Sequence, residues 1–81
     1  RVMDRFVEET AAAIEAERAR GAALPGVPAR DLATALNWMN ERTLQATLEG
    51  EDPSVGEDAV LDTLAEVWLR AIYGTTEPPV G

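Results

Sequence analysis

Apolar residues recur at helical spacing in three stretches of the chain, and each stretch ends at a glycine. Within each stretch the apolar positions lie three or four residues apart, so they share one face of a helix. Gly21, Gly50 and Gly74 stand where those helices would stop, because glycine readily adopts the left-handed conformation that ends a helix. The pattern predicts an all-α chain with helices at about 1–20, 29–49 and 54–73.

The segments between these helices are typical loops. The first connection contains Pro25 and Pro28, and the second reads "GEDPS". Ser54 followed three residues later by Glu57 forms a capping-box pattern, which places the start of the third helix at residue 54. We therefore expect one unit over 1–74, followed by a flexible tail at 75–81 that lacks apolar periodicity. Because the first helix is already running at Arg1 without a cap, we expect the chain to be a fragment.

The second predicted helix carries two asparagines beside its own core stripe. At about 100° per residue, Asn37 and Asn40 share an arc with Glu41, Leu44 and Leu48. An apolar wall with a few polar groups is typical of small-molecule sites, where amides orient a ligand. The simpler interpretation is that both amides bond to another helix or face water. The core stripe itself is expected to consist of Leu32, Leu36, Met39 and Thr43.

Residues from the other two helices could complete a cavity around the asparagines. Met3, Phe6 and Thr10 share a face of the first helix, and Trp68 belongs to the apolar stripe of the third. The indole N–H of Trp68 can donate one hydrogen bond, which suits either a cavity wall or a plain core. Both interpretations remain open from spacing alone.

Surplus apolar positions indicate self-association. Trp38 and Arg42 share the third, otherwise polar face of the second helix, and tryptophan and arginine are enriched at protein interfaces. The third helix has a second seam at Ala65, Leu69 and Ile72. Because an 81-residue chain has a marginal core, we expect these surfaces to pair two copies as a two-fold dimer.

Composition excludes several kinds of chemistry. The chain has no cysteine and no histidine, so we expect no catalytic residue, no metal ligand and no cofactor. Its formal net charge of −8 would repel a phosphate backbone, so this stretch is not expected to bind nucleic acid by itself. No apolar run approaches the roughly 20 residues that cross a bilayer, which favours a cytoplasmic protein.

Four other classes deserve comparison. An acyl carrier would use a serine that opens a helix, but the sequence around Ser54 lacks the Asp-Ser-Leu signature and a capping box explains that serine. The acidic second loop lacks the ligand spacing of a calcium-binding EF-hand. Acid pairs such as Glu8 and Glu9 are typical of solvated helix faces rather than of enzymes. A helical dimerisation or interaction module without a ligand is the strongest alternative.

Several ordered segments resemble the C-terminal region of TetR-family transcriptional repressors of the EthR-like type (the ethionamide-regulator type). The segments are "TAAAIEAERARGAA", "DLATALNWMNERTL", "EDPSV" and "VLDTLAEVWLRAIYG", and the resemblance extends from about residue 2 to 74. It implies the last three helices of an all-α ligand-binding and dimerisation domain. The helix-turn-helix that binds DNA in this family would lie N-terminal to the chain and is absent from it.

The resemblance also implies a site and a mechanism. A hydrophobic small-molecule effector would bind in an apolar cavity and shift the homodimer away from its DNA-binding form. Glu9 and Gln45 stand where the relatives have aromatic residues, so pocket polarity would differ here. The implied ligand-binding residues are Met3, Phe6, Thr10, Asn37, Asn40, Glu41, Leu44 and Trp68. The implied dimer contacts are the last two helices, with Trp38, Arg42, Ala65, Leu69 and Ile72.

Overall fold

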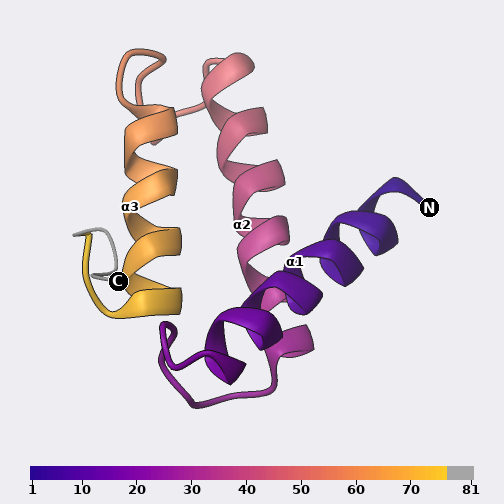
Figure 1. Ribbon diagram of the computed structural model, residues 1–81. Helices are drawn as coiled ribbons and strands as arrows, with labels where there is room; N and C mark the ends of the chain where they lie inside the picture. Colours follow the sequence, from indigo (N-terminus) through magenta and orange to yellow (C-terminus); the bar gives the residue numbers. More distant parts are fainter. Residues whose placement is uncertain (77–81) are drawn as a thin grey trace.

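Three α-helices make up most of residues 1–76, the part of the chain that the computed structural model describes (Figure 1). They are α1 (Val2–Ala19), α2 (Ala29–Leu48) and α3 (Val60–Tyr73), with no strand anywhere in this range. The all-α fold class expected from the periodicity is confirmed. The helices α1 and α2 lie within one residue of the predicted limits.

The helices α2 and α3 run antiparallel, and α1 crosses the N-terminal half of α2 at an angle (Figure 1). The loop after α1 returns beneath the crossing and reaches the C-terminal end of α3. There the backbone N–H of Leu24 donates to the carbonyl of Ile72 at 2.8 Å. Arg18 holds the same loop by donating to the carbonyls of Leu24 and Val27, each at 2.8 Å. These bonds connect the end of α1 to the end of α3.

The main buried cluster lies where α1 crosses α2, and α3 adds Val60 and Leu64 to the buried core. The cluster at the crossing comes only from α1 and α2, and it includes Ile14, which is 2% exposed, and Ala33, which is fully buried. Of the expected stripe on α2, Leu36 is buried and Leu32 is half-buried and packs against the cluster, but the stripe missed Ala29 and Ala33, which are the α2 members of the cluster itself. Alanine adds little to a hydrophobic pattern, yet its small size lets two helix backbones approach closely. The buried cluster consists of Val7, Ala11, Ile14, Ala29 and Ala33.

The end of α2 follows its sequence signal. Gly50 has φ +65°, and the N–H of Glu51 donates to the carbonyl of Ala46 at 3.0 Å. This six-to-one hydrogen bond is the Schellman arrangement, which satisfies a carbonyl that the helix leaves unpaired. A residue with a side chain would be strained at this φ, so the glycine stops the helix where predicted.

The predicted start of α3 at Ser54 is wrong, because the helix begins at Val60. Its N-cap is Ala59, and no side chain caps it, so the Ser54–Glu57 capping box does not form. The cause is a tertiary contact: the hydroxyl of buried Thr47 donates to the carbonyl of Val55 at 2.5 Å. That bond holds residues 54–56 in an irregular conformation beside α2, and a turn at 57–59 then leads into α3.

The predicted flexible tail is described only as far as Thr76, so residues 77–81 lie outside the described part. None of the helices within residues 1–76 has the length and apolar character needed to span a bilayer.

Candidate functional site

A groove of about 530 Å³ lies between the N-terminal half of α1 and the middle of α2. We call it the amide groove, because Asn37 and Asn40 both line it. Phe6, half of whose surface is exposed, contributes to the apolar side of the groove. The exposed carboxylate of Glu41 has no hydrogen-bond or ion-pair partner among residues 1–76. The lining consists of Val2, Met3, Phe6, Asn37, Asn40, Glu41 and Leu44.

Six of the eight residues that the sequence suggested for a ligand site line this groove, and Val2 joins them. Val2 was missed, although it precedes Phe6 by four residues and therefore shares its helix face. The remaining two, Thr10 and Trp68, do not line the groove. They lie behind it and contact the asparagines through hydrogen bonds.

Asn37 is held by α1 and by its own helix. Its side-chain nitrogen donates to the hydroxyl of Thr10 at 3.2 Å and to the carbonyl of Ala33 at 2.8 Å. Because both hydrogens of the amide have partners, the side chain is fixed in one orientation. The simpler interpretation, in which the amides bond to another helix, therefore holds for Asn37 through Thr10 of α1, and it holds for Asn40 through Trp68 of α3.

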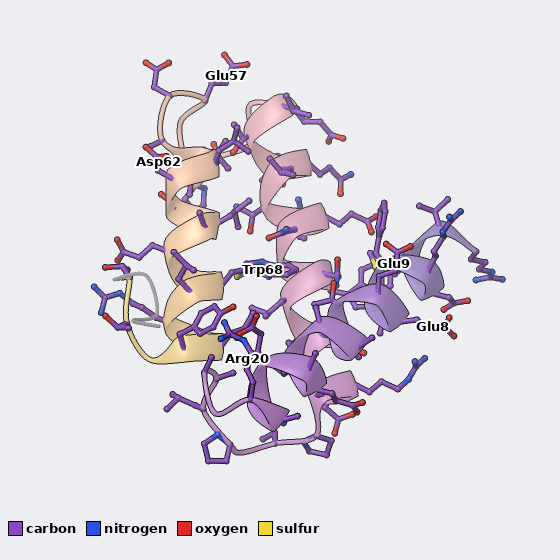
Figure 2. All side chains as sticks on the ribbon, viewed as in Figure 1. Glu8, Glu9, Arg20, Glu57, Asp62 and Trp68 are labelled. Atoms are coloured by element: carbon purple, nitrogen blue, oxygen red, sulfur yellow. The ribbon has the colours of Figure 1, made fainter. Side chains whose placement is uncertain are left out.

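Asn40 is held by α3. The indole N–H of Trp68 donates to the side-chain oxygen of Asn40 at 2.8 Å. In Figure 2, Trp68 projects from α3 toward α2, which agrees with this bond. The two asparagines thus connect α2 to both neighbouring helices while one side of each faces a groove.

Thr10 and Trp68 line a second groove of about 320 Å³, between α1 and the C-terminal half of α3. Ile72 and Tyr73 form the α3 side of this groove, and Tyr73 was not singled out from the sequence. Glu9 lies at the same groove, where its carboxylate accepts from Arg5 at 3.3 Å. The negative charge that Glu9 contributes therefore lies at this second groove and not at the amide groove. Gln45 donates instead to Glu49 at 3.1 Å on the exposed surface of α2.

A third groove of about 440 Å³ lies between α2 and α3, and Asn40 and Trp68 contribute to it as well. We call it the tryptophan groove. Ala65 and Leu69, expected at a dimer contact, line it beside Leu44. Leu61 is 70% exposed at its edge, so α3 presents more apolar surface than the sequence seam suggested.

The other expected dimer residues lie in different settings. Trp38 is 52% exposed on α2, as a contact residue would be. Ile72 instead packs against the core cluster, since the angle of α1 brings the two together.

Arg42 is engaged within the chain. It forms a bidentate ion pair with Glu51, with N–O distances of 3.1 and 2.7 Å. The hydrogen bonds raise the pKa of the Arg42 guanidinium and lower the pKa of the Glu51 carboxyl. A larger groove of about 610 Å³ borders this pair and the loop at 52–55. Arg42 and Glu51 neutralise each other there, and Asp52 adds one further carboxylate to the lining.

Comparison with known proteins gives one consistent family. Residues 1–74 match the family described as "Transcriptional regulator EthR, C-terminal domain". The chain is 58% identical over 72 residues to the HTH-type transcriptional regulator EthR of Mycobacterium tuberculosis H37Rv, covering 89% of this chain and 33% of that protein. It is 52% identical over 80 residues to the protein of the same name from Mycolicibacterium smegmatis, covering 99% and 36%. The chain therefore spans about a third of the length of these curated relatives.

Proposed function

The chain belongs to the family of EthR C-terminal domains, and from that premise we propose that it is the effector-binding and dimerisation part of a transcriptional repressor. The amide groove carries this proposal. It joins apolar side chains from α1 with two asparagines whose orientation is set by hydrogen bonds. Such a combination provides affinity through burial and orientation through the amides, as in small-molecule sites generally.

The effector is proposed to be a hydrophobic small molecule that lies against Met3, Phe6 and Leu44. The groove is lined from two helices, α1 and α2, which pack against each other. An occupant of this groove would therefore contact both helices at once and favour one angle between them. We infer that this is how binding in this part of the protein would reach a DNA-binding unit N-terminal to α1.

Regulation then follows as a shift between populations. A ligand that binds one conformation better than the other moves the equilibrium toward it. Coupling of about 1–3 kcal/mol would change the affinity for an operator roughly 5- to 150-fold. Because chromosomal DNA would be the target, we place the protein in the cytoplasm, without an enzymatic role.

Two copies are proposed to pair through α2 and α3. Trp38 and Leu69 expose apolar surface on these helices, and neither contributes to the buried cluster between α1 and α2. Pairing two such surfaces would bury apolar area that a chain of this size cannot bury alone.

The decisive experiment measures effector binding and DNA release with the protein at its full natural length. Apolar compounds should raise the melting temperature and release operator DNA. The variant carrying both Asn37→Ala and Asn40→Ala should bind them more weakly. If no compound alters either property, the alternative of a helical interaction module without a ligand is the better description.

A further inference from the structure

One arginine at the end of α1 fixes the loop that follows it. The Nε of Arg18 donates to the carbonyl of Leu24, and a terminal nitrogen of the same guanidinium donates to the carbonyl of Val27, each at 2.8 Å. Val27 directly precedes Pro28, the N-cap of α2. Because the guanidinium is a planar fork of donors, two carbonyls bound to it are held at a set separation. Arg18 therefore holds the connection between α1 and α2 in one shape.

Arg18 differs in this from other arginines of this acidic chain. The sequence has fifteen acidic residues against seven arginines, and four of the arginines within residues 1–76 form side-chain ion pairs with nearby carboxylates. Arg18 forms none with a carboxylate in that range, because both hydrogen bonds of its side chain go to backbone carbonyls. Hydrogen bonds from a charged donor are stronger than neutral ones. The side chain of Arg18 thus organises the backbone instead of balancing surface charge.

The same loop is also bound to α3. Leu24, whose carbonyl accepts from Arg18, donates its backbone N–H to the carbonyl of Ile72 at 2.8 Å. Its side chain lies against Gly74, where an added Cβ would come within 2.9 Å of a methyl carbon of Leu24. The absence of a side chain at Gly74 thus lets the loop approach the end of α3 closely. We call the chain of contacts from Arg18 through Leu24 to Ile72 the latch.

Apart from the latch, α1 and α3 are connected weakly. The helix α1 packs on α2 and meets α3 at few points (Figure 1). A groove of about 320 Å³ lies between α1 and the C-terminal half of α3. Within residues 1–76 no side chain of α1 forms a hydrogen bond or an ion pair with α3. The end of α3 is therefore held to α1 by the latch and by the packing of Ile72 on the core cluster.

Two arms of α1 extend from its contact with α2. The buried residues from Val7 to Ile14 form that contact, the amide groove lies along the first arm at residues 2–6, and the latch begins beyond the second arm at residues 15–17. Because a helix rises about 1.5 Å per residue, Arg18 lies roughly 10 Å from the middle of the contact. A change of about 5–10° in the angle of α1 would move Arg18 by about 1–2 Å. Helix shifts of about this size occur at the subunit interfaces of allosteric proteins.

We propose that Arg18 is a positioning residue that transmits effector binding at the amide groove to α3 through the latch. An occupant of the groove turns the first arm of α1, the second arm moves in the opposite direction, and Arg18 carries the loop and the end of α3 with it. Pro25 and Pro28 stiffen the loop, because each fixes its own φ. Since α3 is proposed to pair two copies, this movement changes how the copies face each other. The inference rests on the proposed function and adds the route by which the effector acts.

The ratio of operator affinities without and with a saturating apolar probe, 1-decanol, tests this on the protein at its full natural length. In the wild type the probe should lower operator affinity about 5- to 150-fold. Arg18→Met removes the guanidinium but keeps an unbranched side chain, and it should make that ratio at least about 2-fold smaller. The affinity for 1-decanol itself should change less than about twofold by calorimetry, because Arg18 does not line the amide groove. An unchanged ratio in Arg18→Met would overturn the inference.

Arg20→Met is the matched control. It removes the same charge two residues later, but the side chain of Arg20 donates to Glu17 on its own helix. Its ratio should equal that of the wild type, and a fall of the same size in both variants would also overturn the inference. A purely structural role of Arg18 would lower the melting temperature without changing the ratio. Circular dichroism establishes that both variants are folded.

Spin labels check the hold of the latch directly. Glu15→Cys on the second arm of α1 and Glu66→Cys on α3 provide two exposed positions for labels, and dilution with unlabelled copies isolates the distance within one chain. Arg18→Met should broaden or shift the distribution of this distance, whereas Arg20→Met should leave it as it is without either substitution. Identical distributions in all three proteins would show that the latch does not fix α1 against α3.

The failures of the two proposals are distinguishable. If 1-decanol releases operator DNA equally from the wild type and from Arg18→Met, the latch is wrong as a route and the effector function stands. If neither 1-decanol nor any other apolar compound releases DNA from the wild type, both are wrong.

Discussion

The side-chain nitrogen of Asn37 lies 3.2 Å from the hydroxyl oxygen of Thr10, across the crossing of α2 and α1. The bond joins residues that are 27 positions apart in the chain. It fixes an amide at the edge of a groove and contributes to the packing of the two helices. Its removal should therefore have a measurable effect on stability.

Thr10→Val keeps the shape of the side chain but removes the hydroxyl. One N–H of Asn37 then loses its partner, so the free energy of unfolding should fall by about 0.5–1.5 kcal/mol in urea titration. Thr63→Val is the matched control, because Thr63 is exposed on α3, and it should change stability by less than about 0.5 kcal/mol. Equal effects at the two sites would contradict a structural role for the Asn37–Thr10 bond.

Gly74→Ala should destabilise the protein by about 1–2 kcal/mol, because Gly74 has φ +81°. An added Cβ would also lie 2.9 Å from a methyl carbon of Leu24, although that side chain can move aside. Gly56→Ala provides the comparison, since a Cβ at Gly56 meets nothing within 4 Å. Thermal unfolding of the two variants should differ clearly, and a Gly74→Ala protein as stable as Gly56→Ala would refute the backbone argument.

The ion pair between Arg42 and Glu51 should make stability depend on pH. The pKa of the Glu51 carboxyl is lowered in the folded protein by its hydrogen bond from Arg42. The stabilisation is therefore fully present above the unfolded value of about 4.3 and is lost as pH falls through the folded value. Melting temperatures should show wild type above Glu51→Gln at neutral pH, with the difference vanishing in acid.

Two further measurements check the assignment to this pair. High salt should reduce the neutral-pH difference, because both side chains are exposed enough to be screened. Glu57→Gln, at an exposed position in the same loop, should show no comparable difference. A gap between wild type and Glu51→Gln that stayed constant from neutral pH to pH 2 would rule out the ion pair as its cause.

Charge placed on the proposed contact surface should prevent pairing. Trp38→Arg or Leu69→Arg would bring two equal charges together across a two-fold axis, where they would also lose hydration. Light scattering of the protein at its full natural length and micromolar concentration should then report a monomer. Val27→Arg, on the exposed loop after α1, should leave a dimer unchanged. A wild-type protein that is already monomeric would disprove the dimer.

Local sequence was sufficient for the number of helices, for the limits of α1 and α2 to within one residue, and for the face that carries the amides. Asn37, Asn40, Glu41 and Leu44 follow from helical geometry, because residues three or four apart lie side by side on any α-helix. The stop at Gly50 is equally local, since it depends on one backbone conformation.

Tertiary structure decided what those local features do. Ser54 and Glu57 have a valid capping pattern, but a hydroxyl from α2 fixes the carbonyl of Val55 and moves the start of α3 to Val60. Likewise, the periodicity places two amides on one wall, whereas Thr10 and Trp68 decide which atom of each amide stays free. Those partners lie 27 and 28 residues away, and the crossing angle that brings them close depends on small alanines whose hydrophobic signal is weak.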